Sequence, residues 1–205
     1  CVDRSGRLWV GTNGKGVYLY NRENDKFTQY LGDNSGETLF GENIYKMCDY
    51  GDELVIGIHE GKLRKLNKRK NILTDVNAPE VHYKIIRDVA CFDDELWVGT
   101  QSGVYVINEL KNKISHIYND PMCSYSLSDN QIGRIYRDRE NGIWIGTNLG
   151  GVNYCPQRGI EFTRHIPLSR PYTISSKRVR ELVEDEEGNI WVGTEDAGIN
   201  IYDPH

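Results

Sequence analysis

The fold is decided by a segment that recurs five times in the sequence: DRSGRLWVGTNGKGVYLY (3–20), DYGDELVIGIHEGKLRKL (49–66), CFDDELWVGTQSGVYVI (91–107), DRENGIWIGTNLGGVNY (138–154) and DEEGNIWVGTEDAGINIY (185–202). The central residues are Trp9, Val55, Trp97, Trp144 and Trp191, at successive spacings of 46, 42, 47 and 47. Gly always stands two positions later, and Asp stands six positions earlier in every segment except the third. This period predicts a repeat architecture.

Each repeat has the pattern of four short strands. The first strand is an apolar-patterned stretch such as 179–184, and a polar turn follows it. The second and third strands come next, and the fourth is a stretch such as 26–30. The strand around the central position is almost continuously apolar, so it needs cover on both faces. Stacked blades of a β-propeller provide that cover. We expect the Trp to fill the space between blades and the Gly to let the next blade approach closely.

We therefore predict an all-β fold, an arc of a β-propeller with about five four-stranded blades. Three blades are complete and two are partial, so we expect a fragment of a larger propeller. With no linker or change in composition, residues 1–205 are predicted to be one domain. Its repeats cover about 1–30, 43–76, 84–118, 131–166 and 178–205.

Composition narrows the class of function. The chain has 21 Gly and 13 Tyr, 38% hydrophobic residues, and a formal net charge of -5. An acidic chain of this kind repels phosphate backbones, so we expect no nucleic-acid partner. No apolar run approaches the ~18 residues that span a bilayer, and no signal peptide is visible. The five Cys are scattered without metal-binding spacing, and we interpret them as small, mostly buried side chains that do not decide the compartment.

The string D-x-x-G-x-(I/L)-W-(I/V)-G-T resembles the two-component regulator propeller repeat. It occurs at 3–12 and 185–194, and loosely at 138–147, and YSLSDNQIGRI (125–135) is similar to that family's connection between blades. The second repeat departs from it with Val55 and Ile58 in place of Trp and Thr, and the third with Cys91 in place of Asp. Sialidase Asp-boxes have Asp-x-Gly spacing, which does not fit.

The resemblance implies a periplasmic sensor in a hybrid two-component receptor of the Bacteroidetes type. In that family a membrane helix, a histidine kinase, a receiver and a DNA-binding output follow the sensor, and the usual signals are oligosaccharides. For this chain the resemblance implies a role in carbohydrate sensing, as part of a receptor that signals through a phosphorelay and regulates transcription. It also implies a receptor dimer, attached to the membrane only through segments outside this chain.

No catalytic motif occurs in the sequence, and we predict no catalytic residue, metal or cofactor. The turn residues Asp3, Asp49, Asp138 and Asp185 are interpreted as caps of their hairpins. His116 and His165 fall late in their repeats, where exposed structural positions on outer strands are expected.

A ligand is expected at one rim, where the loops between second and third strands meet the connections between blades. Amides and carboxylates there suit sugar hydroxyls, Arg forms a bidentate fork, and aromatic faces pack on pyranose rings. An acidic sugar would favour the Arg side chains, and a neutral sugar the amides and Tyr. The predicted ligand-binding residues are Asn13, Lys15, Tyr45, His59, Glu60, Gln101, Arg134, Asn148, Arg178, Glu195 and Asp196.

Three hypotheses stand after the sequence alone. The first is a periplasmic sensor that binds an oligosaccharide. The second is a protein-interaction scaffold, because propellers also bind peptides and fold alone does not choose function. The third is a carbohydrate-active enzyme, which needs paired carboxylates on one rim.

Overall fold

The computed structural model describes residues 1–30, 39–58, 61–156, 162–168 and 173–203. It contains five sheets, each of three or four antiparallel strands in sequence order, as the sequence predicts. The chain divides into two compact units, Cys1–Asp93 and Asp94–His205, which are described separately. The prediction of a single domain stays a prediction.

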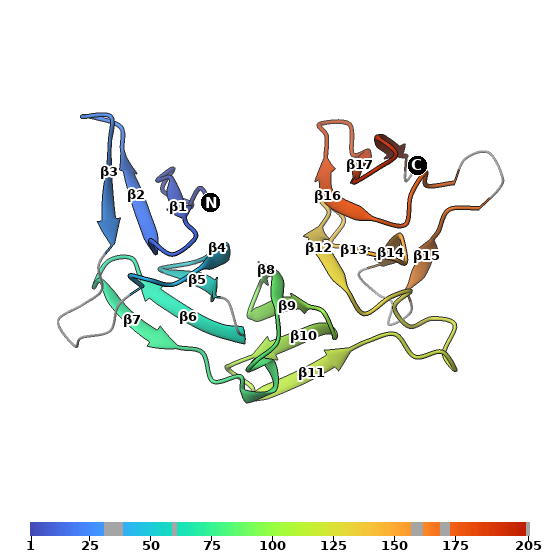
Figure 1. Cartoon of the computed structure of the whole chain (residues 1–205), viewed down its shortest axis with the longest axis horizontal. Helices are drawn as coiled ribbons and strands as arrows, with labels where there is room; N and C mark the ends of the chain where they lie inside the picture. Colours follow the sequence, from blue (N-terminus) through green and yellow to red (C-terminus); the bar gives the residue numbers. More distant parts are fainter. Residues whose placement is uncertain (31–38, 59–60, 157–161, 169–172, 204–205) are drawn as a thin grey trace. The chain divides into compact units, whose positions relative to one another are not determined.

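The first unit contains a three-stranded meander, a four-stranded meander and the first strand of a third sheet (Figure 1). The first sheet has the strands β1 (Trp9–Gly11), β2 (Val17–Asn21) and β3 (Lys26–Tyr30). The second has β4 (Ile44–Tyr50), β5 (Glu53–Ile58), β6 (Lys62–Asn67) and β7 (Ile72–Asp75). A short 3-10 helix, η2 (Pro79–Val81), precedes β8 (Ile86–Phe92).

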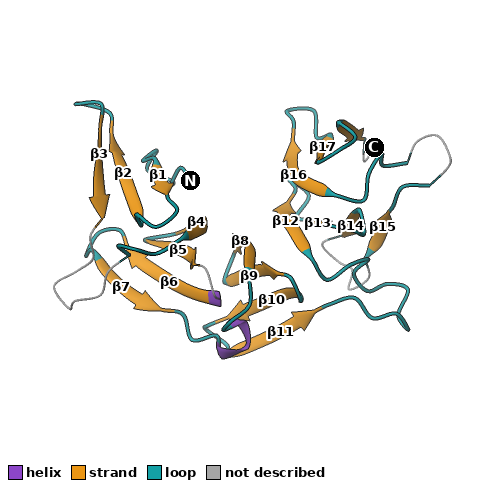
Figure 2. Ribbon diagram, in the orientation of Figure 1, coloured by secondary structure: helices purple, strands orange, loops and turns teal. Residues whose placement is uncertain are grey.

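The second unit repeats the same meander, and strands dominate throughout (Figure 2). Its first strands are β9 (Glu95–Thr100), β10 (Gly103–Asn108) and β11 (Lys113–Ile117), which belong with β8 to the third sheet. The fourth sheet has β12 (Ile132–Arg137), β13 (Ile143–Thr147), β14 (Val152–Cys155) and β15 (Thr163–His165). The fifth has β16 (Val179–Glu184), β17 (Ile190–Thr194) and β18 (Ile199–Tyr202).

The core of each unit lies between consecutive sheets. In the first unit, Trp9 from the first sheet packs in one cluster with Leu54, Ile56 and Leu66 from the second. In the second unit, the cluster around Trp144 draws side chains from the fourth and fifth sheets. The residues of β5 after Glu53 are all buried, which confirms that the continuous apolar pattern marks strands covered on both faces.

The glycine two positions after each central residue permits this stacking. A Cβ on Gly11 would lie 2.5 Å from Cγ2 of Ile44, the first residue of the next sheet. A Cβ on Gly99 would lie 2.6 Å from the corresponding atom of Ile132. The predicted close approach is therefore confirmed at these positions, because a side chain there would overlap the neighbouring sheet.

The four Trp are not equally buried. Trp9 and Trp144 are 4% and 1% exposed, whereas Trp191 is 39% exposed. The described residues place no further sheet against Trp191, which accounts for its exposure. The structural role predicted for the Trp side chains therefore fits best where a neighbouring sheet is present.

Most of the turn Asp residues cap their hairpins as predicted, but they also bind the Trp. Asp3 Oδ1 accepts the backbone N–H of Ser5 and of Arg7, both at 3.0 Å. Its Oδ2 accepts the indole N–H of Trp9 at 3.0 Å. The same indole–carboxylate bond occurs in the fourth sheet at 2.7 Å and in the fifth at 2.8 Å. The carboxylate thus ties the first hairpin to the inter-sheet core.

The prediction that Asp49 is a hairpin cap is wrong. The second sheet has a shorter hairpin, in which Tyr50 pairs directly with Glu53, so Asp49 lies inside β4. Its carboxylate accepts the backbone N–H of Arg4 at 3.1 Å and the ammonium of Lys68. Because the central residue of this repeat is Val, no indole competes for that carboxylate.

Candidate functional site

The predicted rim has a consistent local structure in the described residues. The hydroxyl of Thr147 donates to the carbonyl of Gly151 at 2.9 Å, and that of Thr194 donates to Gly198 at 2.7 Å. Thr12 makes the same bond in the first sheet and Thr100 a similar one in the third. This bond closes the loop between the second and third strands. This bond was not predicted from the sequence, although a Thr stands three positions after each Trp.

These loops are also joined to the connections between sheets, as the rim hypothesis requires. The backbone N–H of Asn148 donates to the carbonyl of Gln131 at 2.8 Å, and that of Glu195 donates to Arg178 at 3.0 Å. In the first unit, the N–H of Ile44 donates to the carbonyl of Thr12 at 2.9 Å. Both kinds of segment therefore form one edge within each unit.

The first unit holds three predicted site residues that the structure describes. Asn13 and Lys15 are exposed in the loop before β2, and Tyr45 is 47% exposed near the start of β4. The ammonium of Lys15 lies over the ring of Phe40, 5.9 Å from its centroid. His59 and Glu60, also predicted, lie outside the described residues.

The second unit holds the remaining predicted loop residues. Arg178, Glu195 and Asp196 are exposed, whereas Asn148 and Gln101 are half-buried. The amide of Asn148 donates to Oε1 of Gln131 at 3.2 Å, and Glu195 accepts from Arg180 at 2.5 Å. The exposed polar groups of this edge are therefore concentrated around the connection that enters β16.

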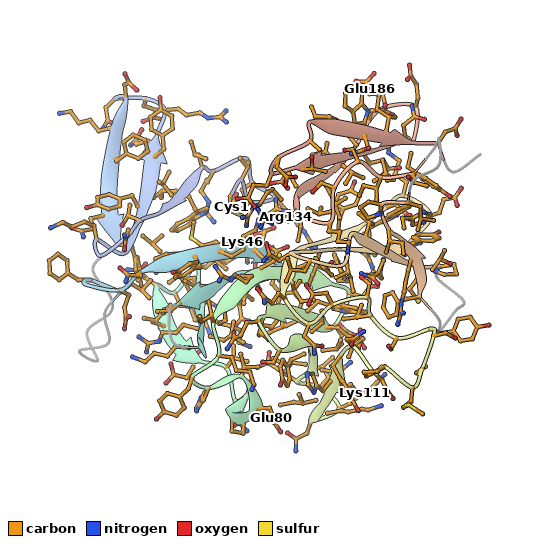
Figure 3. All side chains as sticks on the ribbon, turned by 45° about the vertical axis from the view of Figure 1, so that its right-hand side comes forward. Cys1, Lys46, Glu80, Lys111, Arg134 and Glu186 are labelled. Atoms are coloured by element: carbon orange, nitrogen blue, oxygen red, sulfur yellow. The ribbon has the colours of Figure 1, made fainter. Side chains whose placement is uncertain are left out.

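Arg134 is held in an ion pair between neighbouring sheets. Its Nε lies 2.6 Å from Oε1 of Glu181, which occupies the matching position in the fifth sheet. In the first unit, Lys46 on β4, labelled in Figure 3, occupies the position that corresponds to Arg134. It forms an ion pair with the buried Asp88 on β8 at 3.3 Å. The opposite charge beside Arg134 makes it a weaker anion receptor than the sequence suggests, because a ligand must compete with Glu181.

A cavity of about 640 Å³ lies between the fourth and fifth sheets, and residues of the connection that enters β16 form part of its lining. Trp144, His165 and Tyr202 line it, with a ring-centroid distance of 5.0 Å between the last two. In the first unit, the comparable space beside Trp9 contains Leu73 from the fourth strand of the next sheet. The fifth sheet has three strands in the described residues.

His165 differs from its predicted exposed position. Its Nε2 is buried and has no hydrogen-bond partner among the described residues. Burial lowers the pKa of His165 below its usual value of 6.5. His116, in contrast, is exposed as predicted and stacks on Tyr105 with a centroid distance of 4.2 Å. The sequence places both on outer strands but does not reveal which one a Trp covers.

Carboxylates gather at the opposite edge, beside a cavity of about 200 Å³. Glu184 accepts from the hydroxyl of Tyr136 at 3.0 Å, and Asp138 accepts the indole N–H of Trp144. Burial and the bond to Glu184 raise the pKa of Tyr136 to about 12. Because these carboxylates are engaged in structural contacts, this edge offers little support for a glycosidase pair.

In the part of the chain that the structure describes, no three His, Cys, Asp or Glu side chains are grouped to hold a metal ion. No helix among the same residues is long and apolar enough to cross a membrane.

Comparison with known proteins agrees with the repeat pattern. The model of the two component regulator propeller family matches residues 126–149 and 173–196, which cover the entries into β12 and β16 and the strands that follow. Histidine kinase P4 of Formosa agariphila is 24% identical over 157 residues. That match covers 73% of this chain and 11% of the kinase, so the chain spans about a tenth of its curated relative.

Solved structures show the fold. The extracellular domain assigned to a hybrid two component system of B. thetaiotaomicron superposes with a TM-score of 0.74 at 22% identity, over 98% of this chain and 26% of that domain. PorZ, a surface component of the type-IX secretion system of Porphyromonas gingivalis, gives 0.73 at 16% identity, over 95% of this chain and 30% of PorZ. The Swd1 β-propeller domain of Myceliophteria thermophila gives 0.71 at 13% identity, over 98% and 62%.

The predicted fold and the predicted resemblance are both confirmed. The sheets are propeller blades, and the matched segments include two of the strings quoted from the sequence, at 138–147 and 185–194. Residues 126–149 and 173–196 match the repeat of the two component regulator propeller family, and the similar solved structures show that the fold is that of a β-propeller.

Proposed function

We propose that this chain is the ligand-sensing part of a two-component receptor, that it lies in the periplasm, and that it binds glycan-derived oligosaccharides at the rim. The observation that carries the proposal is the pair of regulator propeller repeats in a chain similar to the extracellular domain of a hybrid two component system. In this proposal the kinase lies outside the chain, and the chain itself has no catalytic role.

The rim chemistry supports a sugar ligand. Around the connection that enters β16, Arg178 and Asp196 are exposed, and Asn148 presents a half-buried amide. These groups donate and accept hydrogen bonds in fixed directions, which suits a ligand rich in hydroxyl groups. The backbone bonds that join the loops to the connections hold the groups in place before a ligand arrives, which reduces the entropic cost of binding.

The first experiment measures the thermal stability of the chain against a panel of plant, host and microbial oligosaccharides. A sugar present at ~100 times its dissociation constant stabilises the folded state by about 2.7 kcal/mol if it binds only that state. A shift confined to one sugar class supports the proposal. Failure of every sugar in a broad panel contradicts it.

Substitution then locates the site. Arg178→Ala should weaken binding about tenfold or more, because hydrogen bonds from a charged donor contribute about 1.5–3 kcal/mol. Lys111→Ala is the matched control, since it removes an exposed cation from the turn between β10 and β11 (Figure 3). Equal affinities in the two variants would place the ligand away from Arg178.

Receptor function further requires self-association, and we propose that ligand binding shifts a dimer arrangement. A ligand biases such an equilibrium only by its differential affinity for the two states. Small-angle scattering with and without saturating sugar tests this. Identical profiles would contradict a ligand-driven rearrangement.

A protein-interaction scaffold is the second candidate, and exposed apolar residues near the rim favour it. Phe40, Tyr45 and Leu149 are 56%, 47% and 49% exposed. Binding of a peptide panel with no response to sugars would select this candidate. Release of a hydrolysed product from the sugar that binds would instead select the carbohydrate-active enzyme.

A further inference from the structure

Two of the cysteines face each other across neighbouring sheets in the first unit. Cys48 lies on β4 and Cys91 on β8, and both are half-buried thiols. An ion pair joins the same two strands at 3.3 Å, from Lys46, two residues before Cys48, to Asp88, three residues before Cys91. A Cβ on Gly57, which pairs with Lys46, would lie 3.0 Å from Val89. The inner strands of these two sheets are therefore in close contact at the level of the cysteines.

The second unit shows what occupies the equivalent positions. There, Arg134 pairs with Glu181, and the hydroxyl of Tyr136 donates to Glu184 at 3.0 Å. Tyr136 stands two residues after Arg134, just as Cys48 stands two residues after Lys46. Glu184 stands three residues after Glu181, just as Cys91 stands three residues after Asp88. Both cations pair with the Gly two positions after the central residue. The two cysteines thus stand where a direct side-chain contact joins the fourth and fifth sheets.

The neighbouring thiol of Cys48 also raises the pKa of Cys91, in keeping with two side chains that lie close together. We propose that they are a disulfide pair, and that an oxidising environment links the second and third sheets covalently through them. The inference concerns a modification that the sensor proposal does not need, and its test does not depend on any ligand.

The reaction balances as thiol–disulfide exchange with a soluble organic disulfide. One cysteine thiolate attacks a sulfur of the reagent, forms a mixed disulfide and releases one reagent thiol. The other cysteine attacks the protein sulfur of that mixed disulfide and releases the second reagent thiol. The protein loses two electrons and two protons, and the reagent gains both.

The chemistry of Cys91 sets the rate. The contact with Cys48, burial and the nearby charge of Asp49 raise the pKa of Cys91, so its thiolate is scarce near neutral pH. Because the thiolate is the nucleophile, we expect slow formation near pH 7 and faster formation as the pH rises.

The experiment treats the reduced, folded chain with oxidised glutathione, blocks remaining thiols by alkylation, digests under non-reducing conditions and maps the peptides by mass spectrometry. We expect one linked peptide pair that contains Cys48 and Cys91. The exposed thiols of Cys1 and Cys123 should carry glutathione or the alkyl group instead. Recovery of both paired cysteines as alkylated thiols, or their linkage to other cysteines, would overturn the proposal.

Two variants provide the control. Cys48→Ser should abolish the linked peptide and leave Cys91 as a thiol or a glutathione adduct, whereas Cys123→Ser should leave the linked peptide unchanged. Circular dichroism of each reduced variant establishes that it is folded. A linked species of the same yield in Cys48→Ser would equally refute the pairing.

Discussion

The close approach between blades makes a quantitative prediction at Gly146. A Cβ there would lie 2.5 Å from Cγ1 and 3.1 Å from Cβ of Val179, which is buried on the first strand of the next sheet. A β-branched side chain in a buried strand has little freedom to move aside. Overpacking by one methyl group costs about 1–3 kcal/mol, so Gly146→Ala should lose that much of its free energy of unfolding.

Gly193 is the matched control, because it occupies the same position in the next repeat. A Cβ there would meet nothing closer than 3.6 Å, the Cβ of Glu181. Gly→Ala at a position that accepts the methyl group stabilises by about 0.4–1 kcal/mol through the unfolded state. We therefore expect Gly193→Ala to be neutral or slightly stabilising.

The assay is urea denaturation followed by Trp fluorescence, with the slope of the transition compared between variants. For a chain of this length, the loss in Gly146→Ala corresponds to a fall of about 2–12 °C in melting temperature. Val179→Ala in the same background should show a favourable coupling of about 0.5–3 kcal/mol, so that the double variant loses less stability than the two single losses added together. Equal midpoints for the two Gly→Ala variants would refute the reasoning.

Three further predictions concern the capping carboxylates, the buried histidine and the proposed disulfide. Asp138→Ala leaves the buried indole of Trp144 unpaired and should lower the free energy of unfolding, measured by urea denaturation, by about 1–3 kcal/mol. Asp185→Ala should lower it by less, because water reaches the half-exposed Trp191. The opposite order of the two losses would count against this reasoning. The pKa of His165 is lower in the folded chain than its ordinary value of 6.5. Its contribution to the free energy of unfolding is therefore fully present above pH 6.5 and is lost as the pH falls below that value. His165→Gln should therefore flatten the decline of melting temperature between about pH 7.5 and 5.5, and an unchanged decline would speak against it. The proposed disulfide closes a loop of 43 residues (91 − 48) and should raise the free energy of unfolding by about 4 kcal/mol, measured as the difference between the linked and reduced chains.

The blade fold was predictable because its determinants lie close together in sequence. A Trp, a Gly two positions later and an Asp six positions earlier specify a hairpin and the face that it buries, as Trp9, Gly11 and Asp3 show. Asp3 also accepts the indole N–H of Trp9, which was not predicted from the sequence. A hairpin cap and an indole bond both require an Asp at the same position, so the sequence pattern does not distinguish them.

The candidate site was less predictable, because its contacts join residues far apart in sequence. Arg134 was predicted as a ligand-binding group, yet it is paired with Glu181, 47 residues further on. That pairing depends on how the two sheets are stacked, which no single repeat records. The Thr bond to the Gly carbonyl in the loops is local and could have been found, since a Thr follows every Trp by three residues.

The departures from the repeat are explained by the same contacts. Cys91 stands where other repeats carry Asp, and it cannot accept an indole proton as a carboxylate does. Trp97 in that sheet donates instead to Glu95 at 3.1 Å. In the preceding repeat Val55 needs no acceptor, which leaves Asp49 to bind Lys68. The bond from the central indole to the Asp six positions earlier is therefore absent from both repeats. In each atypical repeat another local polar contact takes its place: Glu95 accepts the indole N–H of Trp97, and Lys68 binds the carboxylate of Asp49.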